Sequence, residues 1–114
     1  MPHVILEYST ELADDYDLAE IAQELFDVTL ASGVFGAGKD IKTRTIACEN
    51  VIMGARPETF AHLTLRLLAG RPVEVRSTLA KDLLAILEKH MPDVGSISVI
   101  PVELDPEVYV KRVL

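Results

Sequence analysis

The sequence predicts an α/β (α+β) fold, a two-layer sandwich in which a four-stranded sheet carries two helices on one face. Four short stretches of the 114 residues are rich in β-branched and apolar residues or alternate between apolar and polar residues, as strands do. Two longer stretches carry apolar residues three and four positions apart, which indicates amphipathic helices. The pattern β-α-β over residues 2–54 is repeated over 55–104, so we expect one domain, 1–114.

The first half begins with a strand over residues 3–8, which are β-branched and apolar and too few for a helix. A stripe of apolar residues then predicts a helix over 16–31, which starts after several aspartates. Strict alternation at the beginning of 41–53 predicts a second strand, with Lys42 and Arg44 on the same face.

The second half repeats this order. Residues 59–68 alternate as a strand, and a tight Ala-Gly-Arg-Pro connection leads to a helical stripe over 73–90. Residues 96–104 form the fourth strand, and Pro101 places part of it at an edge or a bulge. The remaining residues, 105–114, are of mixed character and leave room for a short additional element.

Crossovers of this length place the strands of each half in parallel and put both helices on one face of the sheet. The other face of the sheet is then bare, although the strands are apolar at most positions on both faces. Because a large exposed apolar patch normally marks an interface, we expect a homo-oligomer that covers it.

Composition excludes several classes of function. Eleven Lys and Arg against 18 Asp and Glu give a net charge of −7, which is unfavourable for binding nucleic acid. No apolar run reaches the length of a membrane span, and residues 1–7 lack the pattern of a signal peptide, so we expect a cytoplasmic protein. The single cysteine rules out an internal disulfide framework and a Cys-rich zinc site.

Four segments resemble one family when they are taken together on this duplicated frame. They are Met-Pro-His at 1–3, LASGVF at 30–35, IKTR at 41–44 and HLTLRLLAGR at 62–71. Over roughly residues 1–90 the chain is similar to the tautomerase superfamily, most closely to the 5-carboxymethyl-2-hydroxymuconate isomerases of homoprotocatechuate degradation, a pathway of aromatic compound catabolism. The resemblance implies a homotrimer that acts on a small carboxylate without a metal or an organic cofactor.

The resemblance also implies that Pro2, exposed by removal of Met1, is the general base and acid. Its chemistry follows from the residue itself. A free α-amino group titrates near 7.7–8.0, and a secondary amine is more basic still, so it is mostly protonated at neutral pH. Burial and nearby cations lower that pKa and make proton transfer efficient. The implied reaction moves a proton between oxygen and carbon of an unsaturated 2-hydroxy or 2-oxo di- or tricarboxylate.

Arg71 directly precedes a predicted helix, where free backbone N–H groups already favour an anion. A guanidinium there can hold a carboxylate with two parallel hydrogen bonds, and in the resembled family an arginine after Ala-Gly belongs to the active site. The family's other active-site arginine lies at the start of the second strand, where this chain has Lys42, with Arg44 two residues later. The expected catalytic residues are therefore Pro2 and Arg71, and the expected substrate-binding residues are Lys42, Arg44 and Arg71.

Two other functions stay open at this point. One is a hydratase or dehalogenase on the same fold, because lysine cannot form the bidentate pair of the missing arginine. The other is a non-catalytic oligomeric binding protein in which Pro2 stays blocked. The other candidate residues have structural interpretations. We expect His62 to be buried or at an interface, His90 to suit a helix C-terminus, and Cys48 to be buried and inert. The loop at 36–39 lacks the spacing of a phosphate loop, and Asp14, Asp15 and Asp17 are expected to cap a helix.

Overall fold

The computed structural model describes all residues, 1–114, and contains four strands and two α-helices in the expected order. A 3-10 turn, η1 (Thr10–Asp14), follows the first strand. The strands are β1 (His3–Ser9), β2 (Lys42–Cys48), β3 (Phe60–Leu68) and β4 (Ser96–Leu104), and the helices are α1 (Leu18–Ala31) and α2 (Val73–His90).

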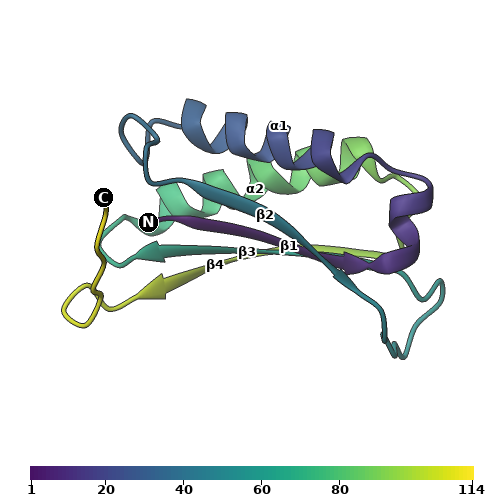
Figure 1. Ribbon diagram of the computed structural model, residues 1–114. Helices are drawn as coiled ribbons and strands as arrows, with labels where there is room; N and C mark the ends of the chain where they lie inside the picture. The colour runs from purple at the N-terminus through teal and green to yellow at the C-terminus, as the bar shows by residue number, and fades with distance from the viewer.

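The four strands form one sheet in the order β2-β1-β3-β4, and both helices cover the same face of it (Figure 1). Within each half the two strands are parallel, as expected from their helical crossovers. The halves meet at β1 and β3, which pair antiparallel, so the two β-α-β units run in opposite directions. The predicted two-layer sandwich is confirmed.

The register brings three chain segments to one end of the sheet, the end where β1 and β2 begin and β3 finishes. His3, the first residue of β1, lies opposite Lys42 at the start of β2 and opposite Arg66 near the end of β3. The residues before β1 and the connection from β3 to α2 therefore meet at this end. Gly70, in that connection, has a φ of +130°, a conformation that side chains disfavour, and it lets the chain turn sharply before Arg71.

Helix α1 begins two residues later than the sequence predicted, because its N-cap is Asp17. The Asp17 carboxylate accepts hydrogen bonds from the backbone N–H groups of Ala19 and Glu20, both at 3.1 Å. Asp14 ends the 3-10 turn instead of capping the helix, and Asp15 follows it. Of the three aspartates expected to cap this helix, only Asp17 does so.

Strand β2 ends at Cys48, so the prediction of a strand as far as residue 53 was wrong. The physical reason is the lack of a partner. Strand β2 pairs only with β1, whose last residue, Ser9, lies opposite Cys48. Beyond that point no backbone remains for the chain to pair with, and Ile52 is fully exposed. The C-terminal residues 105–114 also form no helix or strand.

The core lies between the helices and the sheet and forms one cluster of 16 buried residues. The helices contribute the apolar stripe that the sequence shows, and the strands contribute every second residue. Burial of each large side chain contributes roughly 1.5–3 kcal/mol to stability. The fully buried leucines and isoleucines of the cluster are Leu6, Ile21, Leu25, Leu63, Leu65, Leu67, Leu83 and Leu87.

The helix-free face of the sheet is mixed in character and less apolar than the sequence suggested. Ile46 and Ile100 are exposed by 46% and 49%, and Val102 is also exposed. Basic side chains occupy the end of the sheet where β1 and β2 begin, and they interrupt the apolar surface. No helix of the molecule combines the length and the apolar character that crossing a bilayer requires.

Candidate active site

Pro2 lies at the end of the sheet where β1 begins, and it is almost completely buried. Its carbonyl accepts a hydrogen bond of 3.1 Å from the backbone N–H of Lys42, so the pairing of β1 with β2 extends to this residue. Met1 is half-buried beside it. Burial lowers the pKa of the amino group of Met1, Lys111 and Lys42 add to that effect, and Asp40 opposes it.

The two candidate cations of β2 have different neighbours. The Nζ atom of Lys42 donates to the backbone carbonyl of Asp40 at 3.2 Å and lies near the amino terminus. The Nη1 atom of Arg44 donates to Nδ1 of His3 at 3.0 Å. Lys42 is thus the candidate cation of β2 that acts on the amino terminus, whereas Arg44 is tied to the first residue of β1.

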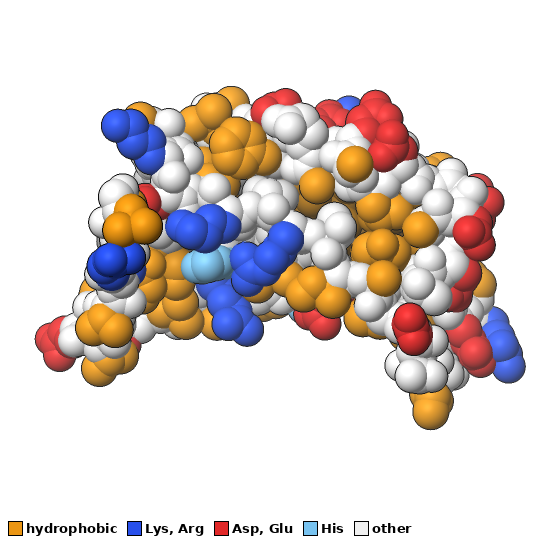
Figure 2. Space-filling view, in the orientation of Figure 1, with side chains coloured by type: hydrophobic (Ala, Val, Ile, Leu, Met, Phe, Trp, Pro, Cys, Tyr) orange, Lys and Arg blue, Asp and Glu red, His pale blue; other side chains and the backbone are white.

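A basic cluster forms where these strands begin, defined here as His3, Lys42, Arg44 and Arg66. Figure 2 shows Lys and Arg side chains gathered around a histidine over this part of the molecule. Burial lowers the pKa of His3, and the positive charges of Arg44, Lys42, the amino terminus and Arg66 lower it further. None of the three Lys and Arg side chains forms an ion pair with a carboxylate, so the cluster is an unneutralised positive patch on a chain of charge −7.

Arg71 lies at the same end of the fold, one residue before the N-cap of α2. Its Nη1 atom donates to the carbonyl of Leu68 at 3.1 Å, and Nη2 donates to the carbonyl of Val34 at 3.4 Å. Its guanidinium also lies over the ring of Phe35, 4.7 Å from the ring centre. The loop after α1 therefore holds Arg71 in place, although no hydrogen bond joins Arg71 to Pro2.

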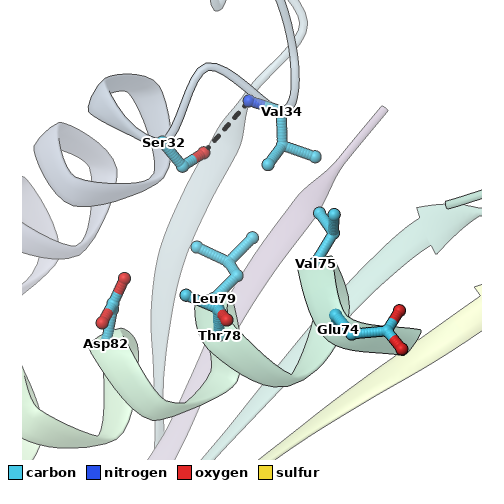
Figure 3. A pocket seen from close by; sticks show the side chains of 7 residues that line it. All are labelled: Ser32, Val34, Glu74, Val75, Thr78, Leu79 and Asp82. Carbon is cyan, nitrogen blue, oxygen red and sulfur yellow. Dashed lines mark hydrogen bonds between the residues drawn. The ribbon is translucent and has the colours of Figure 1, made fainter. Parts of the chain in front are cut away.

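A groove of about 360 Å³ opens between the end of α1 and the start of α2 (Figure 3). Glu74 and Asp82 give its rim two carboxylates, so it is unsuited to a substrate that is itself a carboxylate. Pro2 lines none of the cavities of the single chain. The other residues around this groove are Ser32, Val34, Val75, Thr78 and Leu79.

Sequence reasoning missed Asp40, whose backbone carbonyl accepts a hydrogen bond from Lys42, because only the path of the loop brings it to the site. His3, which follows Pro2 in the sequence, accepts a hydrogen bond from Arg44. The other residues of interest lie elsewhere. His62 is half-buried on the helix-free face and contacts Ser98 at 2.6 Å, and Cys48 is half-buried instead of buried. His90 ends α2, as expected, and also pairs with a glutamate of α1.

Comparison with solved structures shows which proteins share this fold. A 5-carboxymethyl-2-hydroxymuconate isomerase from Deinococcus radiodurans R1 is 27% identical, and the match covers 97% of this chain and 88% of that one, with a TM-score of 0.86. A second structure, of a 5-carboxymethyl-2-hydroxymuconate delta-isomerase, is 20% identical over 99% of this chain and 88% of the other, with a TM-score of 0.80.

A fused 4-OT, solved as a symmetric trimer, shares the fold at 15% identity over 92% of this chain and 88% of that one, with a TM-score of 0.74. No curated protein matches the sequence. The model of the family described as 5-carboxymethyl-2-hydroxymuconate isomerase matches residues 2–107, from the candidate proline into the C-terminal segment. This chain therefore belongs to the 5-carboxymethyl-2-hydroxymuconate isomerase family and has the tautomerase fold.

Proposed function

We propose that this protein is a cofactor-independent isomerase of small unsaturated 2-hydroxy or 2-oxo di- or tricarboxylates of the 5-carboxymethyl-2-hydroxymuconate type. The observation that carries the proposal is the position of Pro2, which is buried at the end of the sheet where the cations Lys42 and Arg71 also lie. The family match includes this proline, and the proposal requires removal of Met1 to free its nitrogen.

The proposed proton transfer uses Pro2 twice. Its nitrogen takes the proton of the substrate hydroxyl, and the O–H electron pair becomes the π bond of a carbonyl group. The conjugated double bonds shift by one position, and the carbon at the far end takes the proton back from the Pro2 ammonium. The enzyme returns to its starting state, so one group with a pKa near the working pH serves as base and then as acid.

The cations bind the substrate and stabilise the developing dienolate. Arg71 retains three of its five N–H donors after its bonds to two backbone carbonyls, enough for a bidentate pair with a carboxylate. Lys42 is the better candidate for the family's second arginine, because it lies near the amino terminus while Arg44 is tied to His3. Arg44 remains available on the same strand face, in the basic cluster.

We also propose that the protein is a homotrimer in which neighbouring copies cover the helix-free face. Exposed apolar residues on that face, such as Ile46 and Ile100, support this assembly. The trimeric fused 4-OT with the same fold supports it as well. A single copy leaves Pro2 outside any cavity, so the substrate site requires the loss of Met1 and the walls that neighbouring copies supply.

The test is a Pro2→Ala variant, which keeps a primary amine but lacks the ring. Turnover of 5-carboxymethyl-2-hydroxymuconate is followed by ultraviolet absorbance, with intact mass to check that Met1 is removed and light scattering to check three copies. We expect a fall in kcat of at least about a hundredfold, the range of general acid–base catalysis, with the trimer intact. Pro92→Ala, an exposed proline after α2, is the matched control. Unchanged turnover in Pro2→Ala, or full activity in protein that retains Met1, would contradict the mechanism.

A further inference from the structure

The C-terminal segment, residues 105–114, passes the end of the sheet where Pro2 lies. In Figure 1 it leaves β4 and runs beside the N-terminus. Lys111 pairs with Asp40 there, with 3.2 Å between Nζ and Oδ1. This pair is the only hydrogen bond or ion pair between residues 109–114 and the rest of the chain. Apolar packing holds the segment only weakly, since Val110 is 89% exposed.

The charges around the amino terminus are few. Asp40 and Lys42 approach it from the loop before β2 and from the start of β2, Lys111 approaches from the C-terminal segment, and His3 follows on β1. The nitrogen of Pro2 is one residue further along, and consecutive Cα atoms are about 3.8 Å apart. The amine thus moves by less than the screening length of about 8 Å in physiological salt when Met1 is removed, so the same charges act on the nitrogen of Pro2.

Asp40 is the one carboxylate that acts on the amino terminus, and its charge stabilises a protonated amine. Such an amine cannot serve as a base. Lys111 counteracts this effect in two ways: it neutralises Asp40 through the ion pair, and its own positive charge disfavours an ammonium nearby. Lys42 contributes its charge as well, but its Nζ atom binds the backbone carbonyl of Asp40 and not the carboxylate.

We propose that Lys111 is a positioning residue for catalysis: by pairing with Asp40 it keeps the Pro2 amine unprotonated and ready to act as a base. This inference rests on the proposed function of Pro2. It gives the C-terminal segment a role in the reaction, and it assigns Asp40 and Lys111 opposite effects on the same proton. Because both side chains are about half exposed, their replacement leaves the core untouched.

The test measures kcat/KM against pH at low ionic strength for Lys111→Gln, Asp40→Asn and the double variant. We expect Lys111→Gln to lower kcat/KM about two- to fivefold on the acid side of the profile and to leave the alkaline plateau unchanged, as one partly screened charge does. Asp40→Asn should have the opposite effect, and the double variant should return to within about twofold of the wild type. The effects should shrink in 1 M NaCl, because screening is then much stronger.

Arg112→Gln is the matched control, since Arg112 carries the same charge on the adjacent residue and forms no ion pair. Its profile should coincide with that of the wild type. A Lys111→Gln profile identical to the wild type overturns the inference. A loss that Asp40→Asn does not reverse, or one that is equal at all pH values, also overturns it, because Lys111 would then contact the substrate directly. These outcomes are distinct from failure of the proposed function, in which Pro2→Ala retains activity.

Discussion

Replacement of Arg71 by lysine tests whether its guanidinium holds the carboxylate of the proposed substrate. In the structure this guanidinium performs three tasks at once. It donates to the carbonyls of Leu68 and Val34, it lies over the ring of Phe35, and it keeps three N–H donors free. Lysine keeps the charge but ends in one compact ammonium group, so it cannot reach both carbonyls and also form a two-bond contact with a carboxylate.

The expected size of the effect follows from the bonds that are lost. One hydrogen bond to a charged group is worth about 1.5–3 kcal/mol, and each 1.4 kcal/mol changes an equilibrium constant tenfold. Losing one of the two bonds to the substrate carboxylate should therefore lower kcat/KM by about 10- to 150-fold. Most of the change should appear in KM, since in the proposed mechanism Arg71 binds the carboxylate before and during proton transfer.

The assay is steady-state kinetics on a dienol carboxylate, followed by ultraviolet absorbance. Arg56→Lys makes the same substitution on an exposed residue in the connection between β2 and β3, and it should leave both constants unchanged. The reasoning is refuted if Arg71→Lys alters KM by less than about twofold, or if Arg56→Lys produces a comparable loss.

Two further predictions concern the supports of the site. Gly38 has a φ of +77°, and an added Cβ would clash with the side chain of Leu30, so Gly38→Ala should reduce the free energy of unfolding by about 1–3 kcal/mol. Gly36→Ala, at a φ of +59° with open space, should lose only the backbone part; equal losses in urea denaturation would disprove the clash. The lowered pKa of His3 means that folding favours its neutral form, so its contribution to stability is present above about pH 6.5 and is lost as the pH falls towards the folded-state value. An NMR titration should give a pKa below 6.5 that rises in Arg44→Gln, and a wild-type value at or above 6.5 would count against the basic cluster.

Most of the secondary structure was predictable because it depends on local patterns. The helix over 73–90 and the strand over 96–104 have the predicted bounds, since apolar periodicity defines both and Pro92 follows the helix. The end of β2 was not predictable in this way. Its last residues have no partner in β1, and the length of a partner strand is a property of the sheet.

The residues of the candidate site were predictable from the sequence, but their positions in space were not. Pro2 and Arg71 were predicted from the family resemblance that residues 1–3 and 62–71 carry. Their placement at the same end of the sheet depends on the antiparallel pairing of β1 with β3, which no local pattern contains. Lys111 is about 70 residues from Asp40 in the sequence, and only the path of the C-terminal segment joins them.

The sequence by itself determined which segments are helices and strands, since side chains at periods of two and of three to four residues select the face that is buried. It also determined which reactive and charged side chains are present, a proline at position 2 and several cations on an acidic chain. The tertiary structure alone decided which charges act on the amino terminus. Electrostatic interactions depend on distances through space, and those distances are set by strand register and loop path.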